Sequence, residues 1–101
     1  MTTTNFRTYD LAVLLYRECV KIKMPHYLKD QLLRASSSVA LNLSEGRAKR
    51  SAKDERRFFD IAFGSLKETQ TILNLAQAPQ SVVALADTTA AHLYKLIQYL
   101  T

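Results

Sequence analysis

Residues that make tight turns are rare in this sequence, and their scarcity constrains the fold more than any other feature. The 101 residues include two glycines and two prolines. A sandwich or barrel of many short strands needs more turns than four such residues can supply. Because 48% of the residues are apolar and 23% are charged, the chain can nevertheless bury a core. We therefore expect one domain built from a few long helices.

Four stretches are predicted to be helical, and each has start or stop signals at its ends. They cover about residues 8–23, 27–45, 52–78 and 82–100 of a single domain, 1–101. Thr8, Ser51 and Ser81 are the expected N-caps, and Ser51 with Asp54 forms a short capping box. Gly46 is expected to follow the second helix as its C′ residue. Short connections favour an all-α, antiparallel up-down four-helix bundle.

The second and third predicted helices carry more apolar surface than a lone bundle needs. Their apolar positions span roughly 160° of the helical wheel, whereas the fourth helix has one narrow stripe. We interpret the broad faces as a second buried surface, and hence predict an oligomer. The alternative is ordinary surface exposure of apolar residues.

Several classes of function find no support in the sequence. The longest apolar run, Leu11–Tyr16, has six residues, whereas a membrane span needs roughly 20. The N-terminus lacks the pattern of a secretory signal, so a cytoplasmic location without membrane association is expected. The single cysteine, Cys19, excludes an internal disulfide, and His26 and His92 lack metal-ligand spacing. We expect no metal, no cofactor and no catalytic residue, and therefore no enzyme.

Small and polar residues lie where a helix interior does not favour them. Ser36–Ser38 and Asn42 compete with backbone hydrogen bonds, and Gly64 costs about 1 kcal/mol relative to alanine. Such conflicts between local propensity and helix often mark function. Gly64 and Ser65 are predicted to form a point of close helix approach opposite Ala35–Ser38.

Four polar residues, Arg34, Asn42, Glu45 and Glu68, form a candidate cluster with two interpretations. The first is a functional polar site, because paired carboxylates can do acid–base chemistry or hold a metal. The second, which we favour, is an inter-helix or inter-subunit network in which Arg34 pairs with Glu45 or Glu68, since a buried carboxylate requires a partner. No nucleophile–base pair accompanies these residues.

Most of the excess positive charge is concentrated between residues 47 and 57. This segment has six basic and two acidic residues, a charge of +4 out of a total of +5. Cations near a helix N-terminus oppose its dipole, so helix stability does not account for them. A nucleic-acid backbone is the expected partner, with steep salt dependence; the alternative is a solvated turn that maintains solubility. No aromatic residue alternates with these cations, so base stacking is not expected there. The predicted nucleic-acid-binding residues are Arg47, Lys49, Arg50, Lys53, Arg56 and Arg57.

Three stretches, Asp30–Ala35, Ser38–Gly46 and Arg57–Thr69, resemble a known family. It comprises small bacterial four-helix bundle proteins encoded in intervening sequences of 23S ribosomal RNA genes, which are also labelled ribosomal-protein-like. The resemblance implies a homopentamer without an assigned catalytic role. It also implies a relation to the accessory variability protein of diversity-generating retroelements, a basic pentameric barrel that binds a reverse transcriptase and nucleic acid. The positions that match the family motif, read as structural or interface residues, are Arg34, Asn42, Glu45, Gly46, Phe58, Gly64, Ser65 and Glu68.

Three functional hypotheses follow. The first is a non-enzymatic, oligomeric accessory protein that binds RNA or DNA through the basic turn. The second is a scaffold that binds another protein, with no role in nucleic-acid binding. The third is a small enzyme that uses Glu45 and Glu68, and it is the least supported.

Overall fold

The computed structural model describes residues 6–100, in which it shows four helices and no strand. They are α1 (Arg7–Lys21), α2 (His26–Arg47), α3 (Ala52–Leu75) and α4 (Gln80–Tyr99). The all-α prediction is confirmed. Residues 1–5 and Thr101, which the predicted domain also includes, lie outside the described residues. No helix within 6–100 combines the length and the apolarity that a membrane crossing requires.

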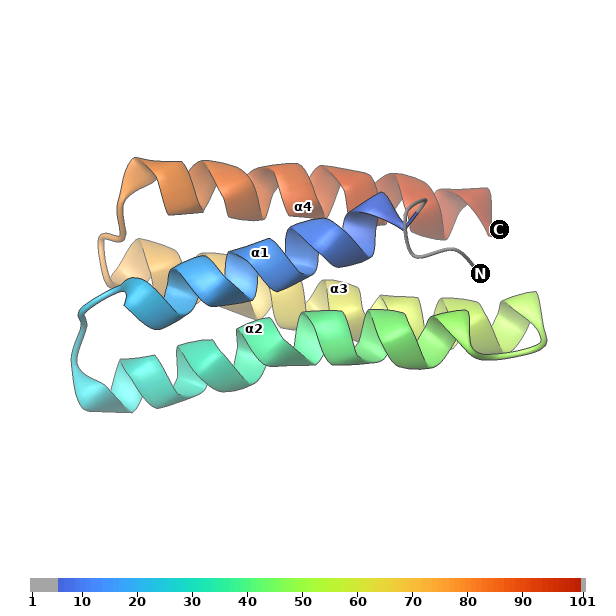
Figure 1. Cartoon of the computed structure of the whole chain (residues 1–101), viewed down its shortest axis with the longest axis horizontal. Coiled ribbons are helices and arrows are strands. Elements are labelled where there is room, and N and C mark those ends of the chain that lie inside the picture. Colours follow the sequence, from blue (N-terminus) through green and yellow to red (C-terminus); the bar gives the residue numbers. More distant parts are fainter. Residues whose placement is uncertain (1–5, 101) are drawn as a thin grey trace.

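The helices lie along the 40 Å axis of a molecule that measures 22 and 20 Å in the other two directions (Figure 1). α1 packs against α2 and α4, and α3 packs against the same two helices, with α2 and α3 forming the most extensive pair. The connections α1–α2 and α3–α4 lie at one end of the molecule (Figure 1). The α2–α3 connection lies at the other end, together with the start of α1 and the end of α4.

One of the three predicted N-caps is confirmed. The Ser51 hydroxyl accepts a hydrogen bond of 3.1 Å from the backbone N–H of Asp54, as a capping residue does. The predictions for Thr8 and Ser81 are wrong, because α1 begins after Phe6 and α4 begins after Pro79, neither of which makes a side-chain cap. The Pro79 carbonyl instead accepts the backbone N–H groups of Val82 and Val83.

Hydroxyl groups buried in the core are satisfied within their own helices. Ser36, Thr69 and Thr89 each donate to the carbonyl four residues earlier, at 2.7, 2.9 and 2.7 Å. No buried side-chain nitrogen or oxygen among residues 6–100 lacks a hydrogen-bond partner. The poor helix propensity of Ser36 is therefore compensated by this local bond, and does not mark a functional site.

Cys19 is fully buried in α1 beside Ser36. Burial raises the pKa of the thiol from 9.0 to about 11, and a hydrogen bond with Ser36 acts in the opposite direction. The folded chain therefore binds this proton more tightly than the unfolded chain does.

The raised pKa of Cys19 predicts a loss of stability in alkali. This contribution to stability, about 3 kcal/mol, is fully present below pH 9 and is lost progressively as the pH rises through about 11. Between pH 8 and 11, urea unfolding should show a larger decrease in the free energy of unfolding for the wild type than for Cys19→Ala. The variant keeps the same tyrosines and lysines, so it controls for their titration. Parallel losses in the two proteins would contradict this assignment.

Candidate nucleic-acid interface

Six cations gather around the connection between α2 and α3, at the end of the molecule that also holds the start of α1 and the end of α4 (Figure 1). We call this set the basic end; its members are Arg47, Lys49, Arg50, Lys53, Arg56 and Arg57. The connection between the helices is four residues long, 48–51, and the Ser51 cap determines where α3 begins. The charge concentration predicted from the sequence is therefore also a concentration in space.

Two of the six cations are held by other side chains of the same subunit. The guanidinium carbon of Arg47, a half-buried residue, lies 4.6 Å from the centroid of the Phe6 ring. The Lys49 ammonium lies 5.0 Å from the centroid of Phe58 and 3.3 Å from a carboxylate oxygen of Glu45. Contacts of this kind stabilise a cation over an aromatic face. Arg47 and Lys49 therefore contribute to the packing of the turn.

Three other cations, Arg50, Lys53 and Arg56, are exposed. Within residues 6–100 they make no side-chain hydrogen bond, ion pair or ring contact, although Asp54 and Glu55 are close in sequence. Arg57 combines both features: its side chain is exposed, and its guanidinium carbon lies 5.1 Å from the centroid of the Phe58 ring. Exposed cations without a counter-charge create a positive potential that attracts anions.

The predicted close approach of α2 and α3 occurs at Ser65 but not at Gly64. The hydroxyl oxygens of Ser38 and Ser65 lie 2.8 Å apart, and the Asn42 amide donates to the Ser38 carbonyl and hydroxyl at 2.9 and 3.0 Å. Gly64 is exposed, and a Cβ atom added there would meet nothing within 4 Å. The prediction of a contact at Gly64 is wrong within one subunit, because this residue points away from α2.

Gly46 is the glycine that a close contact requires. A Cβ atom at this position would lie 2.9 Å from ring carbons of Phe59 and 3.0 Å from the Cβ of Phe58. Gly46 is buried within α2, which continues to Arg47, and no glycine in the described chain has a positive φ. The prediction that Gly46 follows the second helix as its C′ residue is therefore wrong, and the missing side chain instead makes room for the Phe59 ring.

The predicted pairing of Arg34 with Glu45 or Glu68 does not form within the subunit. All three residues are exposed, and Glu45 pairs with Lys49 instead. Arg34 and Glu68 take part in none of the ion pairs among residues 6–100. The carboxylates are therefore not buried, and the network stays a prediction only for contacts between subunits.

Exposed motif residues share one face of the molecule with exposed apolar side chains. Ser38 follows Arg34 by four positions and precedes Leu41 by three, so these residues line one side of α2. On α3, Ser65 likewise follows Ile61 by four positions and precedes Glu68 by three. The two rows of residues, one on each helix, therefore lie on either side of the Ser38–Ser65 contact. Leu41 and Leu75 are each 67% exposed. We call this set the α2–α3 outer face; its members are Tyr27, Arg34, Leu41, Glu45, Ile61, Gly64, Glu68 and Leu75.

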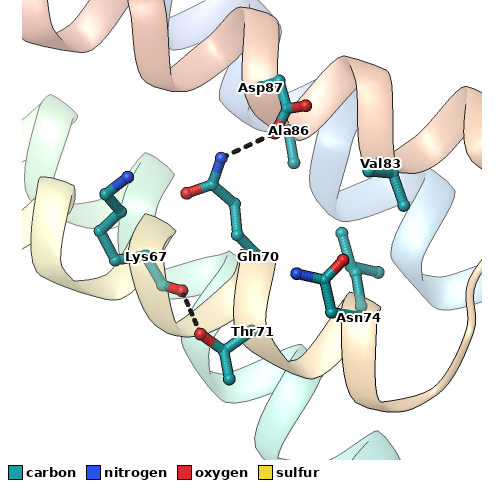
Figure 2. Close-up of a pocket in the computed structure, with 8 residues that line it drawn as sticks. Lys67, Gln70, Thr71, Asn74, Val83, Ala86 and Asp87 are labelled. Atoms are coloured by element: carbon teal, nitrogen blue, oxygen red, sulfur yellow. Dashed lines mark hydrogen bonds between the residues drawn. The ribbon is translucent and has the colours of Figure 1, made fainter.

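A groove of about 430 Å³ runs between α3 and α4 (Figure 2). The Gln70 amide spans the two helices and donates to the Asp87 carboxylate at 2.9 Å. Lys67 lies on the same side of α3, with its ammonium 5.4 Å from the Phe63 centroid. Neither Glu45 nor Glu68 lines the groove, and no group of three potential metal ligands occurs among residues 6–100. The two carboxylates of the enzyme hypothesis are thus not brought together in this groove.

Two features of the basic end were missed from the sequence. Phe6 precedes the predicted start of the first helix, yet it is 2% exposed and carries Arg47 on its ring. Phe58 lies among the cations in space, although no aromatic residue alternates with them in the sequence. The three-residue spacing of Phe6 and Tyr9, which stack at 5.9 Å, was the available signal for the first.

Comparison with known proteins supports the family suggested by the motif residues. A search of curated proteins finds no match. The sequence profile described as "23S rRNA-intervening sequence protein" matches residues 5–100, which is nearly the whole chain. The four-helix, strand-free structure of residues 6–100 agrees with the fold expected from that resemblance. The chain therefore belongs to the 23S rRNA-intervening sequence protein family.

Proposed function

We propose that this chain is a non-enzymatic accessory protein that assembles with copies of itself and binds the backbone of RNA or DNA through the basic end. The observation that carries the proposal is the exposure of Arg50, Lys53 and Arg56 without an intramolecular counter-charge. Phosphate groups are the natural partner of such cations. In this proposal the subunit is an antiparallel bundle that acts in the cytoplasm.

The α2–α3 outer face supports the assembly part of the proposal. Large apolar side chains at Tyr27, Leu41 and Leu75 are 67–68% exposed in the isolated subunit, and contact with another copy would remove them from water. In the same contact Arg34 of one subunit would pair with Glu68 of the next. The family resemblance favours five copies.

Leu41→Glu is expected to dissociate the assembly without unfolding the subunit, because Leu41 is mostly exposed. Light scattering should give five times the 11.5 kDa subunit mass for the wild type and one subunit mass for the variant. Leu14→Glu is the matched control, since Leu14 is 47% exposed on α1, away from this face, and its assembly should persist. A monomeric wild type would contradict the oligomer, and an unchanged mass in Leu41→Glu would contradict the assigned face.

Neutralising the three free cations is expected to weaken nucleic-acid binding at least tenfold. The triple variant Arg50→Gln, Lys53→Gln and Arg56→Gln removes about three phosphate contacts per contacting subunit. Fluorescence anisotropy with a labelled oligonucleotide at 50 and 200 mM NaCl measures both the affinity and its salt dependence. The control variant Arg17→Gln, Lys21→Gln and Lys23→Gln has the same net charge, with the changes at the opposite end (Figure 1). Equal affinity of the two triple variants would contradict the assignment to the basic end.

A protein-binding scaffold is the second candidate, and the exposed apolar residues of the α2–α3 outer face favour it. In that case the face is covered by a different protein. A wild type that is monomeric and binds no oligonucleotide, but retains a stoichiometric protein partner after nuclease treatment, would support this candidate.

A further inference from the structure

The aromatic rings of the basic end are already occupied by the protein itself. Phe59 is fully buried and Phe6 is 2% exposed. Phe58 is half-buried, with the Lys49 ammonium and the Arg57 guanidinium both over its ring at 5.0 and 5.1 Å from the centroid. A base stacks on the same ring face that a cation covers. Phe6 and Phe59 are therefore closed to a base, and a base can stack on a covered face of Phe58 only by displacing a cation.

The exposed tyrosines of α4 do not supply the missing stacking surface. Tyr94 packs beside Phe63, with centroids 6.4 Å apart, and Phe63 lies seven residues, or about two helical turns, beyond Arg56. Tyr99 is 87% exposed, but it follows Tyr94 by five positions and so points about 140° away from it around α4. Because Tyr94 and Asp87 each contact a side chain of α3, Tyr99 points away from the free cations of α3.

The density of phosphate charges then distinguishes a double helix from a single strand as the partner of the basic end. The molecule measures 22 by 20 Å across its long axis. Over 20 Å a double helix presents about 12 phosphate charges, whereas one of its strands presents about six. A site that binds only phosphates gains from the higher density, and a single strand has no stacking energy with which to compensate.

Given the nucleic-acid binding proposed above, we propose that the partner of the basic end is the sugar–phosphate backbone of a double-helical nucleic acid. Arg50, Lys53 and Arg56 contact the phosphates, while Lys49 and Arg57 stay on Phe58. Recognition is then independent of base sequence.

Fluorescence anisotropy on the full chain tests this choice of partner. The probes are a mixed-sequence 20-base-pair DNA duplex, the RNA duplex of the same sequence, and the separate strands, each at 50 and 150 mM NaCl. Both duplexes are expected to bind at least fivefold more tightly than their strands. Phe58→Leu, verified as folded by circular dichroism, should weaken binding to no probe, because it removes no phosphate-contacting cation and releases Lys49 and Arg57 from the ring. The Arg50, Lys53 and Arg56 triple variant should weaken duplex binding at least tenfold.

The outcomes separate this inference from the proposed function. Strands that bind as tightly as the duplexes, or a loss in Phe58→Leu that affects the strands selectively, would overturn duplex recognition while leaving nucleic-acid binding intact. A failure of every probe to bind at 50 mM NaCl would overturn the proposed function, and duplex recognition with it.

Discussion

Phe6→Ala is expected to lower the free energy of unfolding by about 3–5 kcal/mol, the usual cost of removing a buried phenylalanine. The Phe6 ring is 2% exposed, stacks on Tyr9 and lies 6.1 Å from the Phe59 ring. It also carries the Arg47 guanidinium at 4.6 Å. Its removal would therefore leave a cavity at the end of the bundle and also release one of the six cations.

Urea unfolding followed by circular dichroism measures this effect, with Phe6→Leu as the matched control. Leucine keeps most of the apolar volume and loses the ring contacts, so we expect a loss of about 1–2 kcal/mol. A loss below about 1 kcal/mol in Phe6→Ala would show that the ring does not anchor the start of α1. Equal losses in the two variants would show that apolar volume contributes little to this contact.

Gly46→Ala is expected to destabilise the fold by about 1–3 kcal/mol, although alanine is the better helix former. The added methyl group would lie 2.9 Å from the Phe59 ring. That ring is fully buried in the core and cannot move aside without displacing its neighbours. The cost of overpacking thus exceeds the gain of up to about 1 kcal/mol in helix propensity.

Gly64→Ala is the matched control and should have the opposite sign. An added Cβ atom meets nothing within 4 Å, so the variant should gain about 0.5–1 kcal/mol from helix propensity alone. Both glycine variants are best compared by urea unfolding in the Leu41→Glu background, which keeps contacts between subunits out of the measurement. A stabilised Gly46→Ala would disprove the contact with Phe59.

Much of the fold follows from local information. Apolar positions at three- and four-residue spacing predict the four helices, and Ser51 predicts the start of α3 because its cap bond reaches only three residues along the chain. The helix starts predicted at Thr8 and Ser81 are wrong, because a capping hydroxyl is only one way to begin a helix. Phe6 and Pro79 precede α1 and α4 without one.

The candidate site was predictable as a set of charges but not as an arrangement. The sequence places six cations between residues 47 and 57, and it cannot separate Arg47 and Lys49, which contact rings, from Arg50 and Lys53, which do not. For Arg47 that separation depends on Phe6, which is 41 residues away along the chain. Contacts over such distances leave no periodic signal in one sequence.

The two glycines show the same division between local and tertiary information. The local helix signals place both glycines in or beside long helices, where each costs about 1 kcal/mol of helix stability relative to alanine. The packing of α2 against α3 decides which of the two glycines must lack a side chain. Gly46 meets the Phe59 ring and Gly64 meets open space, because helix propensity acts over one turn whereas close packing depends on which side chain a neighbouring helix presents.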